Sequence, residues 1–569
     1  MDTKLISRIA YSDIFNKSEN IKSVINKINP EKAIVLLAII NKYHHEIHKG
    51  FNSELKFILN EWLVNSDKDL KSKVINSYSK LVEKRDIKNY NEIDLSSINI
   101  INRIATLRTI ELLVSQSDLN SDGNDYESIT LENVFKLYLL VNDELSDRQE
   151  KLFQKWLPNI HEKTKEIRFH LYLGLSHVDL TSESISKKLM SEVLKFVQFE
   201  KWLKRQNVHQ DIVNTYLKNL ESNDWYDLFS KVFQLNKIAI NNHIVSKEMY
   251  PELWIILEYF SSHEETSKEW NELTNIRKKP LYKLKNQDYI IIDFSFLLDK
   301  FFSGIYHDLI ELSKKTYINN FHLDYSKNFV EGVLLVNSLK SVFGKSYIQY
   351  SENRIKLNIK KGIENLALPD YYIRNGSKIF IFECKNSFLS NINKINLDCD
   401  LIENEIKDKF FESLGKKKAI KQLLNFINLS EDKQYTFFDN LKKHSNLKYY
   451  PVLVVTDNTL TSIGFNKLFH EYFQNASSNV KSDLVSRIKP LTIIHINDFL
   501  YYNESLKKLD VIIQEFHKYT SNKNAIDGML SFSNFIDFFK FPGKRKIKRE
   551  SIDHILKDSL LPSEHKKSL

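Results

Sequence analysis

Two runs of β-branched and aromatic residues flank the pair Asn375-Gly376 in the segment LPDYYIRNGSKIFIFECKN, residues 368–386. Both residues of this pair tolerate positive φ angles, so the pattern predicts a two-residue turn between antiparallel strands. The second run, IFIFECK, is too apolar for a solvated edge strand and is expected inside a sheet. Because side chains alternate along a strand, the turn also fixes the face to which each side chain points.

The expected turn brings three ionisable side chains to one face of the hairpin. With Arg374 opposite Ser377, Asp370 and Glu383 become diagonal neighbours. Alternation then places Asp370, Glu383 and Lys385 on the same side. Diagonal Cα atoms lie about 7–8 Å apart, which lets both carboxylates reach one ion. A four-residue loop centred on the same turn preserves this arrangement, whereas a loop of odd length does not.

Two carboxylates and a lysine on a buried sheet face are unfavourable unless another charge neutralises the acids. A hard divalent cation prefers carboxylate oxygens, so Mg²⁺ is the expected ion, with Mn²⁺ as its expected substitute. Such an ion activates a water molecule and stabilises charge on a phosphate. Lys385 would orient that water or neutralise the developing charge. The pattern therefore predicts hydrolysis of phosphodiester bonds.

Pro369 and Asp370 on one expected strand, followed by Glu383 and Lys385 on the next, resemble the signature of the PD-(D/E)XK nuclease superfamily. The resemblance covers residues 320–500. It implies a restriction-endonuclease-like α/β core with a mixed central sheet. It also implies a metal-dependent endonuclease that acts on DNA, as in restriction or anti-phage defence.

The same resemblance implies further site residues. A helix before the hairpin commonly supplies another acid in this superfamily, and Glu331 occupies the corresponding place. Many members carry a glutamine on the helix after the hairpin, which corresponds to Gln422, and Phe426 stands where a tyrosine is often found. The backbone carbonyl of Cys384 would bind the metal while its thiol faces away.

Two groups of basic residues are candidates for binding nucleic acid. The first is expected on the helix after the hairpin, and the second lies in a C-terminal segment, residues 540–569, with nine Lys and Arg against four Asp and Glu. Both patterns are equally typical of solvated surfaces, so both interpretations are open. The candidates are Lys416, Lys417, Lys418, Lys421, Lys544, Arg545, Lys546, Lys548 and Arg549.

The distribution of glycine suggests how the chain is divided. Only three of the 12 glycines lie in the first 300 residues, where apolar residues recur at helical spacing. We therefore expect an all-helical recognition or regulatory region in residues 1–275, a PD-(D/E)XK nuclease domain in residues 280–510, and a helical and basic tail in residues 511–569. The run DYIIIDFSFLL is expected to open the nuclease domain. Its strands are expected at 346–350, 367–374 and 378–385 and in YYPVLVV and LTIIHI, and its helices at 326–343 and 399–428.

Several classes of protein do not fit this sequence. Two cysteines are too few for a disulfide framework or a thiolate zinc site, and no nucleotide-binding glycine loop is present. No signal peptide or membrane-spanning run occurs, so we expect a cytoplasmic protein without a membrane partner.

Three functional interpretations follow from these features. The leading one is a nuclease acting on DNA, with the helical region as a candidate surface for a protein partner. The alternatives are a nuclease acting on RNA and a non-catalytic protein that binds nucleic acid or protein on a nuclease fold.

Overall fold

The computed structural model divides the chain into two compact units. The helical unit comprises Asp2–Pro158 and Leu217–Gly304, and the sheet unit comprises Met1, Asn159–Tyr216 and Ile305–Leu569. The structure describes residues 7–16, 19–44, 51–84, 98–115, 127–156, 184–261, 270, 272–316, 320–357, 368–396, 398–431, 439, 446–478, 480, 482–521 and 529–539.

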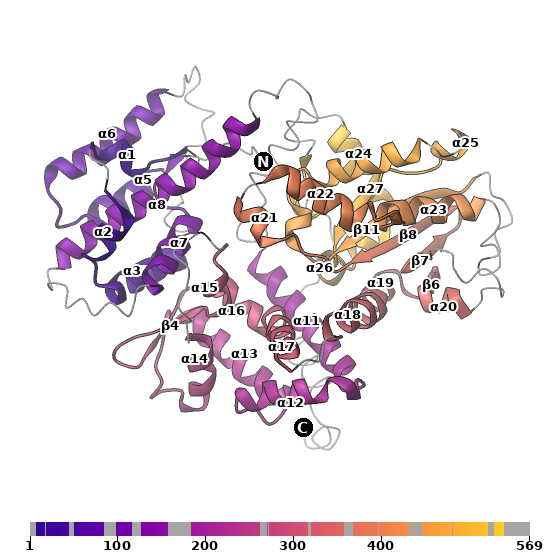
Figure 1. Ribbon diagram of the computed structural model, residues 1–569, viewed down its shortest axis with the longest axis horizontal. Coiled ribbons are helices and arrows are strands. Elements are labelled where there is room, and N and C mark those ends of the chain that lie inside the picture. The colour runs from indigo at the N-terminus through magenta and orange to yellow at the C-terminus, as the bar shows by residue number, and fades with distance from the viewer. Residues whose placement is uncertain are drawn as a thin grey trace. The chain divides into compact units, whose positions relative to one another are not determined.

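The sheet unit is built on a five-stranded mixed sheet in the order β12-β11-β8-β7-β6 (Figure 1). β6, β7 and β8 pair antiparallel, whereas β8, β11 and β12 pair parallel. All five predicted strands form, and the prediction of a mixed α/β core is confirmed. The strands are β6 (Ile348–Ser351), β7 (Tyr371–Asn375), β8 (Lys378–Lys385), β11 (Lys448–Val455) and β12 (Thr492–His495).

Helices cover both faces of this sheet, which explains why β8 is apolar in both alternating positions. On one face Phe380 and Phe382 contact Phe343 of α19. On the other face Tyr372 contacts Phe426 of α23, and α23 also packs on β8 and β11 (Figure 1).

The remaining elements of the sheet unit are mostly helical. They are α11 (Ile185–Leu203), η4 (Asn207–His209), α12 (Gln210–Asn219), α17 (Ser303–Lys315), α18 (Phe321–Asp324), η7 (Tyr325–Leu335), α19 (Val336–Phe343), η8 (Gly344–Ser346), α20 (Glu352–Leu357), α21 (Asn391–Asn396), α22 (Cys399–Phe410), β9 (Glu412–Ser413), β10 (Lys416–Lys417), α23 (Ala419–Glu431), η9 (Asn458–Thr461), α24 (Phe465–Ser477), α25 (Ser482–Val485), α26 (Ile496–Tyr501), η10 (Ser505–Lys508), α27 (Leu509–Ser521) and α28 (Phe532–Phe538). α12 and α17 cross the boundary between the units.

The helical stretch predicted for residues 399–428 is largely helical but is interrupted. The β9–β10 hairpin separates α22 from α23 because Leu414 and Gly415 adopt φ angles of 50° and 75°. Two successive residues with positive φ cannot continue a right-handed helix, and they form a tight hairpin turn.

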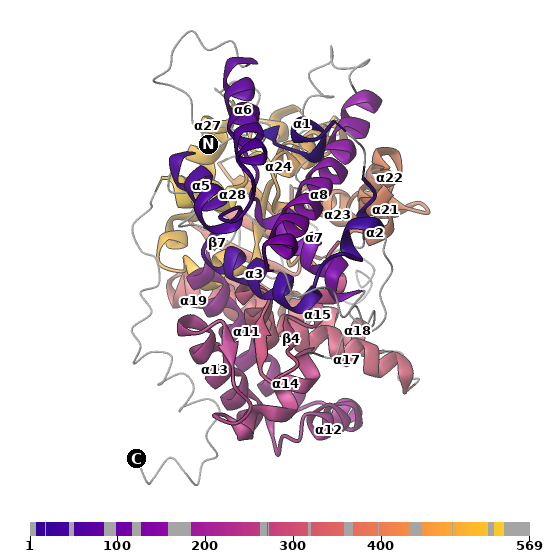
Figure 2. The same cartoon turned by 90° about the vertical axis from the view of Figure 1, so that its left-hand side faces the viewer.

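The helical unit consists largely of packed helices, but the prediction of an all-helical region in residues 1–275 is wrong, because Ser7–Arg8 pair with Ile98–Asn99 and Ile244–Val245 is also a strand. α3 packs on α7, and α7 packs on α8 (Figure 2). Its elements are β1 (Ser7–Arg8), α1 (Tyr11–Ile14), α2 (Ile21–Ile25), α3 (Pro30–Lys42), α5 (Phe51–Phe57), η1 (Ile58–Trp62), α6 (Lys68–Lys84), β2 (Ile98–Asn99), α7 (Arg103–Val114), α8 (Glu127–Trp156), α13 (Trp225–Asn241), β3 (Ile244–Val245), η5 (Pro251–Leu253), α14 (Trp254–Ser261), α15 (Thr274–Lys278), β4 (Leu281–Lys283), β5 (Tyr289–Ile291), α16 (Phe294–Leu298) and η6 (Asp299–Phe301).

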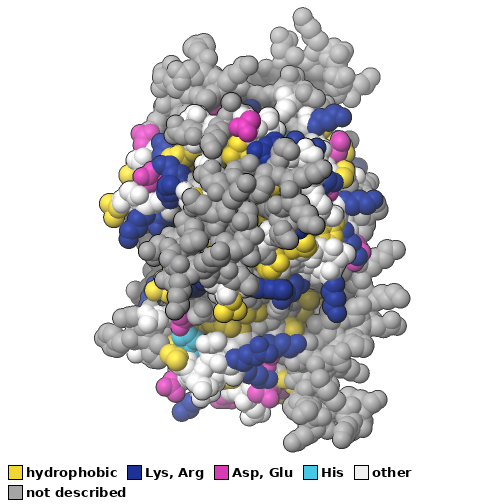
Figure 3. All heavy atoms as spheres, turned by 90° about the vertical axis from the view of Figure 1, so that its right-hand side faces the viewer, with side chains coloured by type: hydrophobic (Ala, Val, Ile, Leu, Met, Phe, Trp, Pro, Cys, Tyr) yellow, Lys and Arg dark blue, Asp and Glu magenta, His cyan; other side chains and the backbone are white. Residues whose placement is uncertain are grey.

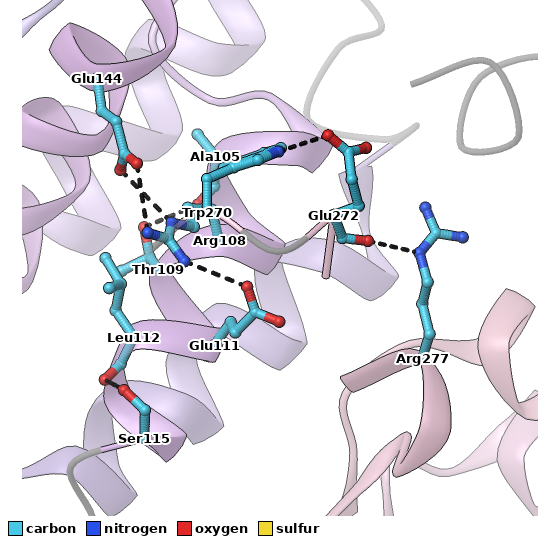
Figure 4. A network of polar contacts seen from close by, with 10 residues as sticks. All are labelled: Ala105, Arg108, Thr109, Glu111, Leu112, Ser115, Glu144, Trp270, Glu272 and Arg277. Atoms are coloured by element: carbon cyan, nitrogen blue, oxygen red, sulfur yellow. Dashed lines mark hydrogen bonds and ion pairs between the residues drawn. The ribbon is translucent and has the colours of Figure 1, made fainter. Parts of the chain in front are cut away.

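Trp270 ties the second segment of the helical unit to the first. The guanidinium groups of Arg108 and Arg148 lie over its indole, at 5.4 and 4.9 Å from the ring centroid. The indole N–H donates to Glu272 at 2.6 Å, and Arg108 also pairs with Glu111 (Figure 4). These two cation–π contacts hold Trp270 against α7 and α8.

The boundaries of the units differ from those expected at residues 275–280. The run DYIIIDFSFLL contributes β5 to a small antiparallel sheet of the helical unit, β3-β5-β4, and does not open the sheet unit. Conversely, α11 belongs to the sheet unit, where the buried Lys187 Nζ lies 2.7 Å from Oδ1 of Asp498. α27 and α28 also belong there, so the described part of the expected tail is integral to this unit. In the described ranges, each helix is too short or too polar to cross a lipid bilayer.

Candidate active site

The turn between β7 and β8 lies one residue later than the sequence predicted. Asn375 pairs with Lys378, so the turn consists of Gly376 and Ser377. Gly376 has a φ of 59°, whereas Asn375 remains extended within β7. A turn with positive φ only at its first central residue needs a single glycine there, and Gly376 meets that requirement.

The shifted turn changes how the two acids of the hairpin face each other. Tyr371 pairs with Phe382, and continuing this register by one residue places Asp370 directly opposite Glu383. The predicted diagonal relation is therefore wrong. The shift moves the pairing by two residues, which preserves the shared face of Asp370, Glu383 and Lys385. Directly opposed Cβ atoms lie about 4.5–5.5 Å apart, closer than the diagonal arrangement allows.

Both acids are held by groups at the end of β8. The Nζ of Lys385 lies 2.8 Å from Oε1 of Glu383, whose side chain is almost fully buried. The backbone N–H of Cys384 donates to Oδ2 of Asp370 at 2.6 Å. The buried thiol of Cys384 takes the opposite face, because side chains alternate along the strand.

Glu331 joins this group from a different element. It lies half-buried on η7, a π-helical stretch that continues directly into α19, where the sequence predicted a helix over residues 326–343. The charges of Asp370 and Lys385 both act on its carboxyl group. The three residues predicted for the centre of the site share one sheet face, and Glu331, predicted as a further acid, lies within their electrostatic influence. π-Helical turns of this kind frequently occur at functional sites.

The electrostatics of the site show an excess of negative charge. Burial, together with the charge of Asp370, raises the pKa of Glu383 and that of Glu331 to about 8. Burial also raises the pKa of Asp370. Burial acts to lower the pKa of Lys385, but the charges of Glu383 and Asp370 outweigh it and the net pKa is raised. One permanently charged lysine therefore compensates only part of the charge of three acids.

A fourth acid at the site, Glu352, was not predicted from the sequence. Its backbone N–H donates to the backbone carbonyl of Asp370 at 3.0 Å, and its carboxylate contributes to the raised pKa of both Asp370 and Glu331. Glu352 belongs to no motif. Its one signal in the sequence is its position two residues after the strand candidate at 346–350, which precedes the hairpin.

Asn386 was also missed, although it follows Lys385 directly. Its Nδ2 donates to Oγ of Ser326 at 2.9 Å, and its Oδ1 accepts a hydrogen bond from Oγ1 of Thr456 at 2.7 Å. These bonds tie the end of β8 to η7 and to the end of β11. They fix the backbone that carries Lys385 relative to the helix that carries Glu331.

Gln422 lies on the side of α23 that faces the site. Phe426, one helical turn later, contacts Tyr372, which shares a sheet face with Asp370 and Glu383. After α23 the chain reaches Asp439, which binds Arg374 opposite Ile379 near the start of β8, so α23 runs antiparallel to β8. Moving one turn back from Phe426 therefore leads toward Glu383. Oε1 of Gln422 is buried without a hydrogen-bond partner among the described residues.

The basic residues predicted to bind nucleic acid lie in different structural environments. Lys416 and Lys417 are exposed on β10, not on a helix as expected, and Lys418 is half-buried beside them. Lys421 is ion-paired with Glu412 and lies over the ring of Phe411. The second group, Lys544, Arg545, Lys546, Lys548 and Arg549, lies outside the described residues.

The donor set suits a hard divalent cation, although the side chains are not arranged around one. Among the described residues, no three His, Cys, Asp or Glu side chains form a metal-binding group as they stand. Glu383 is paired with Lys385, and one oxygen of Asp370 is bound to an amide. Two opposed carboxylates with raised pKa values are nevertheless what a cation would stabilise.

Comparison of the chain with models of protein families, with curated proteins and with solved structures gave no match.

Proposed function

We propose that this protein is a metal-dependent nuclease that hydrolyses phosphodiester bonds in DNA, on a restriction-endonuclease-like fold. The observation that carries the proposal is the convergence of Asp370, Glu383, Lys385 and Glu331 at one end of β8. The order of elements supports the fold: a helix, three antiparallel strands, a helical crossover and a parallel strand. A role in restriction or anti-phage defence is proposed on the resemblance to the PD-(D/E)XK superfamily alone.

Asp370, Glu383 and Glu331 would hold the divalent ion, together with the backbone carbonyl of Cys384. A bound Mg²⁺ supplies charge neutralisation at the phosphate and lowers the pKa of a coordinated water. Lys385 contributes as a permanent cation, because its raised pKa excludes it as a general base near neutral pH. Its ammonium group can donate to a phosphate oxygen or to the attacking water.

Gln422 would act beside these groups as a neutral donor and acceptor. Its Oε1 is buried and accepts no hydrogen bond from the described residues, and a buried acceptor requires a partner. A water molecule or substrate group at the site would satisfy it. This fits the role of orienting the attacking water.

One face of the molecule shows, among the described residues, no basic patch that marks a binding surface for nucleic acid (Figure 3). On the face shown in Figure 3, Lys and Arg side chains of the described residues are spread widely and are not gathered in one patch. The choice of DNA over RNA therefore rests on the resemblance. The helical unit remains a candidate surface for a protein partner.

The experiment that tests the proposal compares substrates and metals. The full-length protein is incubated with plasmid DNA and, separately, with a structured RNA, in Mg²⁺, Mn²⁺ or EDTA. We expect cleavage of the plasmid in either metal, none in EDTA, and loss of cleavage in Asp370→Ala. Cleavage of RNA alone would replace the DNA proposal by its RNA alternative. Cleavage of neither substrate would favour a non-catalytic binding protein.

A further inference from the structure

The β9–β10 hairpin presents an apolar side chain at its tip. Leu414 is 99% exposed and adopts a φ of 50°, and Gly415 beside it has a φ of 75°. A leucine in the left-handed region costs roughly 1–2 kcal/mol, and in full exposure it gains nothing from burial. Glycine or asparagine would suit this turn better. Neither the backbone conformation nor the packing of the free protein accounts for a leucine at this position.

The hairpin is nevertheless firmly held at its base. The backbone N–H of Lys418 donates to the carbonyl of Phe411 at 3.0 Å. Lys421 is ion-paired with Glu412, and its Nζ lies 4.5 Å from the ring centroid of Phe411. These contacts hold both strands of the hairpin against the start of α23, so the exposed turn projects from a well-ordered base.

The hairpin also lies near the candidate active site. Phe426 packs over Tyr372, which pairs with Ile381 of β8. From Phe426 back to Ala419 the helix axis advances about 10 Å, which equals about three residues of a strand. Because α23 runs antiparallel to β8, its start and the attached hairpin lie toward Lys385.

The chemistry of the tip fits one partner. Lys416 and Lys417 are exposed on the arm next to Leu414, which favours an anionic ligand. Proteins that bend duplex DNA insert leucine or similar apolar wedges between base steps from the minor groove. Proteins that bind single strands rely instead on aromatic rings that stack on bases, which a leucine cannot do.

We propose that this hairpin inserts Leu414 into the minor groove of duplex DNA next to the active site, with Lys416 contacting a flanking phosphate. The inference rests on the proposed function and makes it more specific, because it names duplex DNA as the ligand. The insertion would unstack one base step and bend the substrate toward the carboxylates.

Binding is measured in the Lys385→Ala background, so that cleavage does not interfere. The probes are a short fluorescein-labelled DNA duplex, the corresponding single strand, and a duplex carrying 2-aminopurine, whose fluorescence rises on unstacking. Leu414→Gly should weaken duplex binding about tenfold and abolish the fluorescence rise. Its Tm should not fall, because glycine accepts the φ of residue 414. Lys416→Ala should lower the slope of log Kd against log salt by about one.

The matched control is Leu401→Ala, which changes a leucine that is 50% exposed on the neighbouring α22. This variant should bind the duplex as its parent does. Unchanged duplex affinity in Leu414→Gly would overturn the proposal, as would an equal loss on the single strand or a parent protein that binds no duplex. Each result is independent of cleavage. A protein that binds through Leu414 but does not cut would refute the nuclease function and leave the hairpin inference standing.

Discussion

The Nζ of Lys385 lies 2.8 Å from Oε1 of Glu383, two residues earlier on the same face of β8. Despite this ion pair, burial and the neighbouring acids leave Glu383, Glu331 and Asp370 with raised pKa values. A divalent cation would take over the neutralisation of Glu383 and release Lys385 for the phosphate. The pair thus links the stability of the free protein to the chemistry proposed for it.

Asp370→Asn should separate stability from activity. Asparagine can still accept the hydrogen bond from the backbone of Cys384, while the repulsion among the acids falls. We expect the Tm in EDTA to stay unchanged or rise by about 2–4 °C, because sites arranged for catalysis are often destabilising. The rate of plasmid cleavage should fall at least about 100-fold. A lower Tm with retained cleavage would show that Asp370 is structural.

Divalent cations should stabilise the protein through the same acids. At about 100 times its Kd, an ion that binds only the folded state adds about 2.7 kcal/mol. Differential scanning fluorimetry with increasing Mn²⁺ should therefore show a rising Tm for the wild type and a much smaller rise for Glu383→Gln. Glu515→Gln changes an exposed acid on α27 and serves as the control. An equal rise in Glu383→Gln and Glu515→Gln would place the ion elsewhere.

The raised pKa of Glu383 predicts how stability depends on pH in EDTA. The folded state keeps this proton up to a pKa of about 8, whereas the ordinary value is 4.5. Between these values the unfolded chain binds fewer protons, so stability falls as pH rises. One such group changes the free energy of unfolding by at most about 1.4 kcal/mol per pH unit. From pH 5 to 8 the Tm of the wild type should fall more than that of Glu383→Gln. Parallel curves for the two proteins would contradict the assigned pKa.

Asp439 should be essential for the sheet unit although it lies outside the site. Its carboxylate accepts hydrogen bonds from the hydroxyl of Tyr372 and from Nε and Nη2 of Arg374, at 2.6, 2.6 and 2.7 Å. Asp439→Ala leaves a buried hydroxyl and a largely buried cation unsatisfied, which costs about 3–5 kcal/mol. We expect a large fall in Tm, a smaller one for Asp439→Asn, and no rescue by Mn²⁺. A wild-type Tm in Asp439→Ala would show that the carboxylate does not hold β7.

Local patterns predicted the strands and the hairpin acids well. β8 does not alternate between apolar and polar residues and is apolar over Ile379–Phe382, which indicated burial on both faces. The alternation of side chains along each strand was enough to place Asp370, Glu383 and Lys385 on one face. Whether Asp370 lies opposite Glu383 or diagonal to it depended on whether Gly376 is the first or the second central residue of the turn. The sequence Asn375-Gly376 is compatible with either position. The face that these side chains share was unaffected, because moving the turn by one residue shifts the pairing of the two strands by two residues.

Contacts between residues far apart in the sequence could not be predicted from such local patterns. Glu352 and Asn386 join the site through bonds to other elements, so neither stands in a recognisable motif. α11 belongs to the sheet unit because it packs on α26 and η7, and its Lys187 pairs with Asp498, 311 residues later in the chain. The β9–β10 hairpin was hidden because Leu414 gives no sequence signal for a positive φ.

The most direct test of the central claim is the initial rate at which the purified protein nicks supercoiled plasmid in Mg²⁺. Wild type is compared with Lys385→Met and with Lys394→Ala, which removes a lysine on the nearby α21. We predict that Lys385→Met loses activity at least about 100-fold while Lys394→Ala retains it. Equal nicking by all three proteins would contradict the claim that the acids and lysine at the end of β8 form a nuclease site.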